Sequence, residues 1–320
     1  MNILLLYPKE VPWTIGRYLE RSLRKKQYVE VFDLLQEQSY LHYYNIAMQR
    51  RFYNIGKIKF NIPSVKGTFS RRTTNILSIM KKCRKQPDLI IEIDGGGYHH
   101  LEGFKNVDIP KIYWAINSHE SYKLKFQKKI APDFNYIFVA QKDYVSSFKN
   151  IKEKVYWLPM AADHEIHKTY NYPKVFDIGF VGSKKPKKYA DRIKVLNRLS
   201  KRYNVLFIEG IWGKNMSKIY NISKIGFNKS LSGDLTPRVF EIMSIGTMLL
   251  TEAGSGINKL FKDKEHLVIY KSEDELDELI DYYLKNEEER ENIAKKGQRE
   301  VHKYHTYDNR VQYMFEKIGF

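Results

Sequence analysis

The stretch Gly233–Gly246, GDLTPRVFEIMSIG, predicts one short helix with a defined start and a defined end. Thr236 fits the N-cap, and Pro237 fits the first helical position, where its missing N–H costs nothing. Apolar residues follow at helical spacing, at Val239, Ile242 and Met243. Gly246 ends the helix, and the TMLLT run after it reads as a buried strand.

Two charged residues, Arg238 and Glu241, fall in the first turns of this predicted helix, near its positive dipole end. The planar donors of Arg238 suit a phosphate, and the oxygens of an ionised Glu241 can accept from two vicinal hydroxyls. Together they favour a ligand with phosphate and hydroxyl groups, as a nucleotide sugar has. The alternative for each is an exposed charged residue on a helix.

The composition indicates a folded protein of two domains. The chain has 320 residues, 42% of them hydrophobic, and no apolar run reaches the ~18 residues of a membrane span. The N-terminus, MNILLLYPKE, lacks a basic region before its apolar run, so we interpret it as a strand and not as a signal peptide. Cys83 is the only cysteine, which excludes a disulfide and favours the cytoplasm.

The net charge of +18 suggests an anionic partner: a nucleic acid, an envelope polymer or a membrane surface. No acidic residue occurs between Gln38 and Pro87, a window with eleven Lys and Arg and seven Tyr and Phe. We expect this window to bind the acceptor through its arginine pairs, at Arg50, Arg51, Arg71 and Arg72. The alternative is a compositional bias toward Lys, Asn, Ile and Tyr.

Strand and helix patterns alternate along both halves of the chain, which predicts an α/β protein with two Rossmann-like domains facing across a cleft. Residues 161–174 read as the linker. We therefore expect domains at residues 1–165 and 166–303, with a final helix at 304–320. No glycine-rich turn follows the first strand, so a nicotinamide dehydrogenase is disfavoured.

In the first half, polar residues follow two predicted strands. Asp94 ends DLIIEID, and Asn117, Ser118, His119 and Glu120 follow KIYWA. Ligands of open parallel sheets collect at such carboxyl ends. Asp94, His119 and Glu120 are thus the candidates for a catalytic base, although a tight turn and structural roles explain them as well.

In the second half, small and polar residues also follow the strands. Gly182, Ser183 and Lys184 follow VFDIGFV, and Asn228 ends KIGFN. Gly254, Ser255 and Gly256 follow TMLLTEA. Glycines permit close backbone approach to a phosphate, so we expect donor binding here, with ordinary turns as the alternative.

A family resemblance adds to this interpretation. The segments RVFEIMSIGTMLLTEAGSGINKLF, IPKIYWAINSHE, LPMAADHEIH and DIGFVGSKK resemble the CgeB-like (spore maturation protein) group of GT-B glycosyltransferases, over about residues 88–318. The resemblance implies a GT-B fold, with an acceptor domain first, a nucleotide-sugar domain second and a last helix that crosses back to the first domain. It also implies that Glu241 holds the ribose.

The expected function is transfer of a sugar from a nucleoside diphosphate sugar, UDP being the favoured nucleotide, to a protein or an envelope glycan. Many retaining relatives carry a second glutamate where this chain has Gly233, so retention or inversion stays open. No Asp-x-Asp motif occurs, and we expect neither a metal nor another cofactor. The alternatives are a nucleic-acid (DNA) acceptor and a binding protein without transferase activity.

Overall fold

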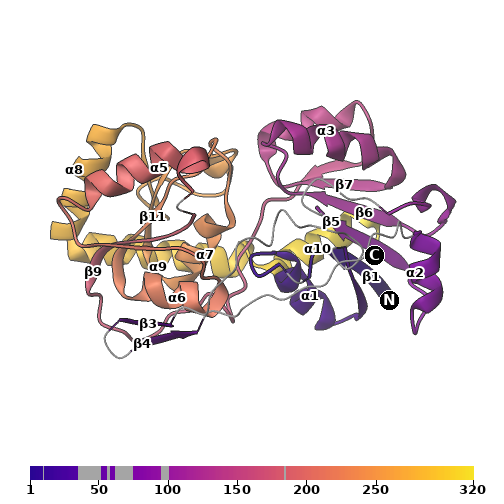
Figure 1. Cartoon of the computed structure of the whole chain (residues 1–320), viewed down its shortest axis with the longest axis horizontal. Coiled ribbons are helices and arrows are strands. Elements are labelled where there is room, and N and C mark those ends of the chain that lie inside the picture. The colour runs from indigo at the N-terminus through magenta and orange to yellow at the C-terminus, as the bar shows by residue number, and fades with distance from the viewer. Residues whose placement is uncertain (10, 35–51, 56–57, 62–74, 95–100, 184) are drawn as a thin grey trace. The chain divides into compact units, whose positions relative to one another are not determined.

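The computed structural model describes the whole chain except residues 10, 35–51, 56–57, 62–74, 95–100 and 184 (Figure 1). The four arginines at Arg50, Arg51, Arg71 and Arg72 and the residue Lys184 therefore lie outside the described residues. The chain divides into two compact units. Unit 1 comprises the described residues of Met1–Gln49, Ser64–Pro159 and Tyr307–Phe320, and unit 2 comprises those of Arg50–Pro63 and Met160–Thr306.

Unit 1 is built on a parallel sheet of six strands in the order β2-β1-β5-β6-β7-β8. The strands are β1 (Asn2–Tyr7), β2 (Tyr28–Asp33), β5 (Leu89–Ile93), β6 (Lys111–Ala115), β7 (Tyr136–Val139) and β8 (Val155–Trp157). The helices are α1 (Gly16–Arg24), α2 (Ile76–Lys82), α3 (Ser121–Ile130), α4 (Ser146–Lys149) and α10 (Tyr307–Ile318). Three short 3-10 helices, η1 (Phe104–Asn106), η2 (Ala131–Asp133) and η3 (Lys142–Tyr144), complete the unit.

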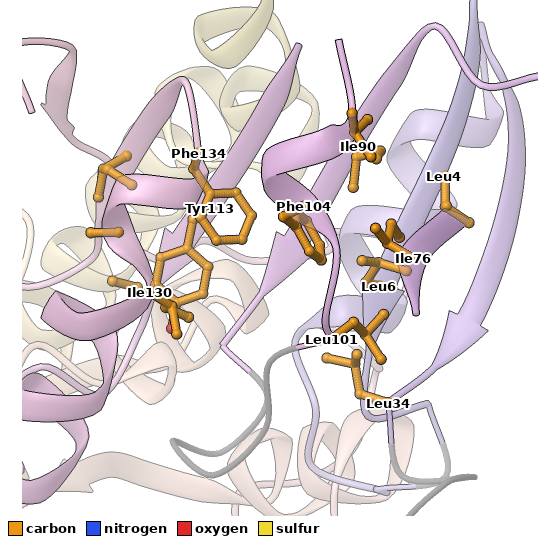
Figure 2. Close-up of a cluster of buried hydrophobic side chains, with 14 of the residues drawn as sticks. Leu4, Leu6, Leu34, Ile76, Ile90, Leu101, Phe104, Tyr113, Ile130 and Phe134 are labelled. Atoms are coloured by element: carbon orange, nitrogen blue, oxygen red, sulfur yellow. The ribbon is translucent and has the colours of Figure 1, made fainter. Parts of the chain in front are cut away.

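The central strands of unit 1 are mostly apolar and are buried along their whole length because helices or loops cover both faces of a parallel sheet. All five residues of β5 and all five of β6 are buried. One cluster of side chains joins Leu4, Leu6 and Ile90 of the sheet to Ile76 of α2 and to the rings of Phe104, Tyr113 and Phe134 (Figure 2).

The last helix, α10, packs against α1 within unit 1. Ser22 Oγ donates to Asp308 Oδ1 at 2.6 Å, and the rings of Tyr18 and Tyr307 have centroids 5.5 Å apart. The buried Arg310 donates from Nε to the carbonyl of Pro159 at 2.7 Å. The C-terminal helix thus belongs to the same unit as the N-terminal strand.

Unit 2 has a parallel sheet of five strands in the order β10-β9-β11-β12-β13. The strands are β9 (Phe176–Val181), β10 (Val205–Ile208), β11 (Ser223–Asn228), β12 (Met248–Glu252) and β13 (Val268–Tyr270). The helices are α5 (Pro186–Leu199), α6 (Gly213–Asn221), α7 (Pro237–Ile245), η4 (Ile257–Lys259), α8 (Glu273–Lys285) and α9 (Glu287–Tyr304). An antiparallel hairpin of β3 (Phe52–Ile55) and β4 (Ile58–Asn61) lies beside α6.

Helices cover both faces of this second sheet, with α5 and α8 on one face and α6 and α7 on the other (Figure 1). Strand residues alternate accordingly: Phe180 and Phe227 join the cluster with α5 and α8. Gly226 lies on the opposite face, where an added Cβ would come within 2.4 Å of Ile242 Cγ2 on α7. The glycine therefore lets α7 approach the sheet closely.

Some predicted elements have different bounds in the structure. The sequence pattern predicts a helix over about residues 188–203. In the structure this helix, α5, begins at Pro186 and is kinked at Tyr189, whose φ and ψ are −126° and 33°. The pattern also predicts one helix over residues 142–149, where the structure has two shorter ones, η3 and α4. The expected linker, residues 161–174, contains neither helix nor strand, but most of its hydrogen-bond partners lie in unit 2.

Candidate functional site

The strand order of unit 2 reverses between β9 and β11. The chain passes from β9 to β10 on one side and then returns to β11 on the other side of β9. A ligand of an open α/β sheet binds outside the carboxyl ends of the strands at such a point. Those ends are Val181, followed by Gly182 and Ser183, and Asn228.

Asn228 is 2% exposed and connects three parts of this site. Its Nδ2 donates to Thr251 Oγ1 of β12 at 3.0 Å. Its Oδ1 accepts from Thr236 Oγ1 at 3.1 Å and from Arg238 Nη1 at 3.4 Å. Asn228 therefore orients the start of α7, and its amide is engaged by the protein itself.

Thr236 occupies the N-cap position of α7, as predicted, but its side chain does not cap the helix. Its hydroxyl donates to Asn228 instead, because the end of β11 lies next to the start of α7. The prediction of a capping threonine was right for the position and wrong for the hydrogen bond. Gly246 ends α7 with a φ of 80°, as a left-handed C-terminal residue.

Arg238 and a second arginine, Arg192 of α5, lie over the same aromatic ring. Their guanidinium carbons are 5.6 and 5.5 Å from the ring centroid of Phe180. Gly182 makes room for that ring, since a Cβ there would lie 2.5 Å from Phe180 Cε1. Two guanidinium groups beside one ring can together bind a diphosphate.

Arg192 was not among the predicted site residues. It is 5% exposed, donates from Nε to the carbonyl of Lys229 at 2.9 Å, and stacks 4.3 Å from the Tyr189 ring centroid. Burial and the positive charge of Arg238 lower the pKa of Arg192 to about 10, so it remains charged at neutral pH. A signal for it exists: Arg192 precedes Val195, Leu196 and Leu199 by three, four and seven residues, so it lies on the buried stripe of α5.

Glu241 lies on the buried side of α7 and is only 7% exposed. Burial raises the pKa of its carboxyl to about 7, although the charge of Arg238 acts in the opposite direction. His167 Nε2 lies 3.5 Å from Glu241 Oε1. The residue is thus not an exposed helical glutamate, and a neighbouring ligand can decide whether its carboxyl is ionised.

The loop after β12 adds backbone groups to the crevice. Ser255 N–H donates to the carbonyl of Gly233 at 2.8 Å, and Gly254 lies against the carbonyl of Asp234. Gly233 and Gly256 have φ values of 68° and 75°, which favour glycine. The structure therefore brings the predicted Gly254–Ser255 turn next to the segment that leads into α7.

The loop after β9 has a more exposed polar group. Ser183 Oγ donates to Glu209 Oε1 at 3.0 Å and accepts from Lys185 N–H at 3.3 Å. The hydroxyl thus closes the turn before α5. Ser183 lies one residue after Gly182, at the carboxyl end of β9.

The predicted base Asp94 lies at the end of β5 in unit 1 and is 6% exposed. Its Oδ2 accepts from Asn117 N–H at 3.1 Å, from Asn117 Nδ2 at 3.2 Å and from Gln127 Nε2 at 3.1 Å. Gln127 in turn accepts from Ser118 Oγ at 2.8 Å. Asp94 thus ties β5 to β6 and α3.

The other two candidates in unit 1, His119 and Glu120, form a separate pair after β6. His119 Nε2 lies 3.9 Å from Glu120 Oε1, which also accepts from Lys123 Nζ at 3.0 Å. Among the described residues, the buried Nδ1 of His119 has no hydrogen-bond partner. His119 therefore retains one nitrogen that is available for proton transfer.

The described residues contain no group of three or more His, Cys, Asp or Glu side chains placed to hold a metal ion. Among the helices that the structure describes, none is long and apolar enough to cross a membrane.

Comparisons with known proteins place this geometry in context. Residues 166–316 match the family model described as "Glycosyl transferase-like". No curated protein sequence matches the chain. The family match begins at residue 166, within the expected linker, and covers the rest of unit 2 and most of α10.

Solved structures match over the whole chain. Anabaena Alr3699/HepE in complex with UDP and glucose is 13% identical, with a TM-score of 0.64 over 100% of this chain and 99% of that one. Sucrose-phosphate synthase from Thermosynechococcus elongatus is 10% identical, with a TM-score of 0.62 over 100% and 98%. An alpha-glucosyltransferase in complex with UDP and a 13-mer DNA containing an HMU base is 10% identical, with a TM-score of 0.64 over 100% of both chains.

These matches confirm the predicted α/β fold of the GT-B type, with two parallel sheets and their helices. Residues 166–316 match the glycosyl transferase-like family, and the chain as a whole has the GT-B fold.

Proposed function

We propose that this chain is a glycosyltransferase of the CgeB-like group, which transfers a sugar from a nucleoside diphosphate sugar to an acceptor hydroxyl. One observation carries the proposal. At the switch point of unit 2, two guanidinium groups, a buried carboxyl and two glycine turns meet at the carboxyl ends of β9, β11 and β12.

The two arginines fit the leaving group of this reaction. As the bond from the anomeric carbon to the diphosphate oxygen breaks, negative charge grows on the diphosphate. Arg192 and Arg238 lie over one ring and repel each other, so a dianion between them is favourable. In this proposal they stabilise the departing diphosphate without a metal ion.

Glu241 fits the ribose. An ionised carboxylate accepts hydrogen bonds only and can take one from each of two vicinal hydroxyls. It lies one turn of α7 after Arg238, the spacing at which two side chains share a helix face. The ribose and the diphosphate of one nucleotide would then contact the same helix.

The acceptor oxygen forms the new bond to the anomeric carbon and loses its proton. In an inverting reaction a base takes this proton, and Asp94, His119 and Glu120 remain our proposals for it. Asp94 and His119 are preferred over Glu120, because Asp94 Oδ1 and His119 Nδ1 have no hydrogen-bond partner among the described residues, whereas Glu120 accepts from Lys123.

UDP is the proposed nucleotide because two structural neighbours were solved with UDP. A protein or an envelope glycan is the proposed acceptor, from the family resemblance. Nucleic acid is the second candidate, favoured by the DNA in one neighbour and by the acid-free window between Gln38 and Pro87.

The donor is tested by a thermal-shift and hydrolysis screen against a panel of nucleotide sugars, first with EDTA and then with Mg²⁺ or Mn²⁺. We expect one nucleotide sugar to raise the melting temperature selectively and to be hydrolysed slowly in both conditions. Arg238→Ala should abolish the shift. Binding without hydrolysis or transfer to any acceptor would support a binding protein instead.

The nucleic-acid acceptor is tested by binding of a DNA duplex and of single-stranded DNA at rising salt. If the basic window contacts phosphates, affinity should fall steeply with salt and drop in the variant that replaces Arg50, Arg51, Arg71 and Arg72 by Ala. A matched variant that replaces four exposed lysines, Lys125, Lys128 and Lys129 of α3 and Lys149 of α4, controls for net charge. Equal losses in the two variants would argue against a specific acceptor surface in the window.

A further inference from the structure

We propose that His167 is a positioning residue for Glu241: its Nε2–H faces Glu241 Oε1 and holds the ionised carboxylate in place for the nucleotide. The inference rests on the proposed function, since it assigns the partner of the group that would bind the ribose. His167 acts through Glu241 and touches no part of the substrate in this scheme.

The backbone fixes the tautomer of His167. Asp163 N–H donates to His167 Nδ1 at 3.2 Å, so Nδ1 carries a lone pair and the hydrogen of the neutral ring is on Nε2. That nitrogen lies 3.5 Å from Glu241 Oε1. The ring is fully buried, so bulk water does not reach this nitrogen, and its 3.5 Å approach to Oε1 is longer than a formed hydrogen bond.

The position of His167 is held from both sides. Its own N–H donates to the carbonyl of Asp163 at 2.7 Å, which closes a tight turn. Its carbonyl accepts from Ser244 Oγ at 2.7 Å, three residues after Glu241 on α7. These contacts keep the ring close to the carboxyl. A small movement is enough to shorten the 3.5 Å contact to a hydrogen bond.

The charge states of the pair fit a neutral donor that meets an ionising acid. Burial lowers the pKa of His167 to about 3, so the ring stays neutral from pH 5 upward. Burial raises the pKa of Glu241 to about 7, so its carboxyl is protonated below that pH and ionised above it. An N–H donor stabilises the ionised carboxylate more than the neutral acid. It therefore lowers the pKa of Glu241 below the value that burial alone would give.

Other titratable or polar groups also face this part of α7. Arg238 lies one turn before Glu241 and favours its ionisation. The charge of Arg238 lowers the pKa of the Tyr220 hydroxyl on α6, and the charge of Glu241 raises it. On the side of α9, His302 contacts Ser244. On the side of the sheet, Asn228 accepts from Arg238. Glu252, at the end of β12, is paired with Lys229. Of these groups, His167 alone is a buried neutral ring with a nitrogen 3.5 Å from Glu241 Oε1.

The test is the pH dependence of UDP binding by calorimetry, from pH 5.5 to 8.5, in wild type and three variants. His167→Phe keeps the ring volume and removes the donor, His167→Gln retains an N–H donor, and Glu241→Gln removes the titrating group. In wild type we expect affinity to rise on the order of tenfold through pH ~7 as Glu241 ionises.

In His167→Phe the midpoint should move up by about one pH unit, so UDP binds about threefold more weakly at pH 7 and within about twofold of wild type at pH 8.5. His167→Gln should restore most of the wild-type profile. In Glu241→Gln only the pH dependence from the terminal phosphate of UDP, whose second pKa is roughly 6, should remain, and adding His167→Phe should have no further effect. An equal loss at every pH in His167→Phe, or a loss that persists in the Glu241→Gln background, would overturn the proposal.

A second measurement does not depend on nucleotide binding. The ¹⁵N shifts of the His167 ring in the free protein report its tautomer, and the Glu241 carboxyl ¹³C shift reports its ionisation. Hydrogen on Nε2, with Glu241 titrating at higher pH in His167→Phe, supports the pair. Hydrogen on Nδ1 would refute it. Failure of wild type to bind any nucleotide would refute the proposed function, and the NMR result would still decide the pairing.

Discussion

Asp94 in unit 1 and Glu241 in unit 2 are both buried carboxyls near the carboxyl end of a central parallel strand, but their surroundings differ. Asp94 Oδ2 accepts three hydrogen bonds from Asn117 and Gln127. Glu241 has a raised pKa, and near it the like charges of Arg238 and Arg192 lie over one ring. Asp94 therefore has protein donors at Oδ2, although its Oδ1 has no hydrogen-bond partner among the described residues, whereas in our proposal a phosphate and two hydroxyls would relieve the charges around Glu241.

This difference separates a structural polar residue from a binding residue better than position along a strand does. Asp94 directly follows β5, as the rule of strand ends requires, whereas Glu241 lies within α7. What distinguishes them is whether the protein itself supplies the partners. The following predictions test this distinction.

The largest effect is expected from the arginine pair. Arg238→Ala or Arg192→Ala removes a charge-assisted contact to the diphosphate, which should weaken UDP binding about 100-fold, or about 3 kcal/mol. Uridine has no phosphate, so its weaker binding should change by less than about twofold. Calorimetry with both ligands checks this, and equal losses for UDP and uridine would show that the arginines support the fold and not the phosphates.

Glu241→Gln should change how stability depends on pH. The folded-state pKa of about 7 is above the unfolded value of 4.5, so folding favours the protonated acid below pH ~4.5 and this contribution is lost as pH rises through ~7. Above pH ~8 the variant should be more stable than wild type by up to about 3 kcal/mol, and at pH 4 the two should be nearly equal. Urea unfolding at several pH values measures the difference. A constant difference across this range would mean that folding does not raise the pKa of Glu241.

Asp94→Ala should affect stability and leave the nucleotide site intact. It leaves the buried donors of Asn117 and Gln127 without their acceptor, a cost of about 2 kcal/mol. UDP affinity should stay within about twofold of wild type. If the variant is as stable as wild type and transfer is lost, Asp94 is a catalytic base, and the distinction between the two carboxyls fails.

The smallest effect concerns Thr236, compared with the capping residue Ser272. Ser272 Oγ accepts from Glu275 N–H at 3.1 Å, whereas Thr236 donates to Asn228. Thr236→Ala and Ser272→Ala should each destabilise the protein by about 1 kcal/mol. Only Thr236→Ala should also weaken UDP binding, by a few fold, since Asn228, which orients Arg238, loses one contact. Thr236→Ser is the matched control, and equal UDP affinity in all variants would remove Thr236 from the site.

The sequence was sufficient to predict the fold, because the buried parallel strands are continuous apolar runs and the helices between them have clear periodicity. It also predicted the start of α7, because Pro237 and Gly246 have strong positional preferences. The bounds of α5 were less accurate, because the kink at Tyr189 interrupts its pattern.

Side-chain partners were harder to predict than elements. Arg192 was recoverable, since a charged residue on an apolar stripe is unusual, but His167 has no such pattern in LPMAADHEIH. The direction of the Thr236 hydroxyl depends on how close β11 comes to α7, which is a tertiary contact. The burial of Glu241 depends in the same way on packing between α6, α7 and the linker.

The segment between Met160 and Val175 has a consequence for amide hydrogen exchange. It forms neither helix nor strand, yet its N–H groups at Ala162, His167 and Tyr170 donate to His305, Asp163 and Asn221. Its carbonyls at Ile166 and Lys168 accept from α6. These amides should therefore exchange as slowly as those of the helices they contact, so that protection along the chain follows these cross-links and not the boundaries of regular secondary structure.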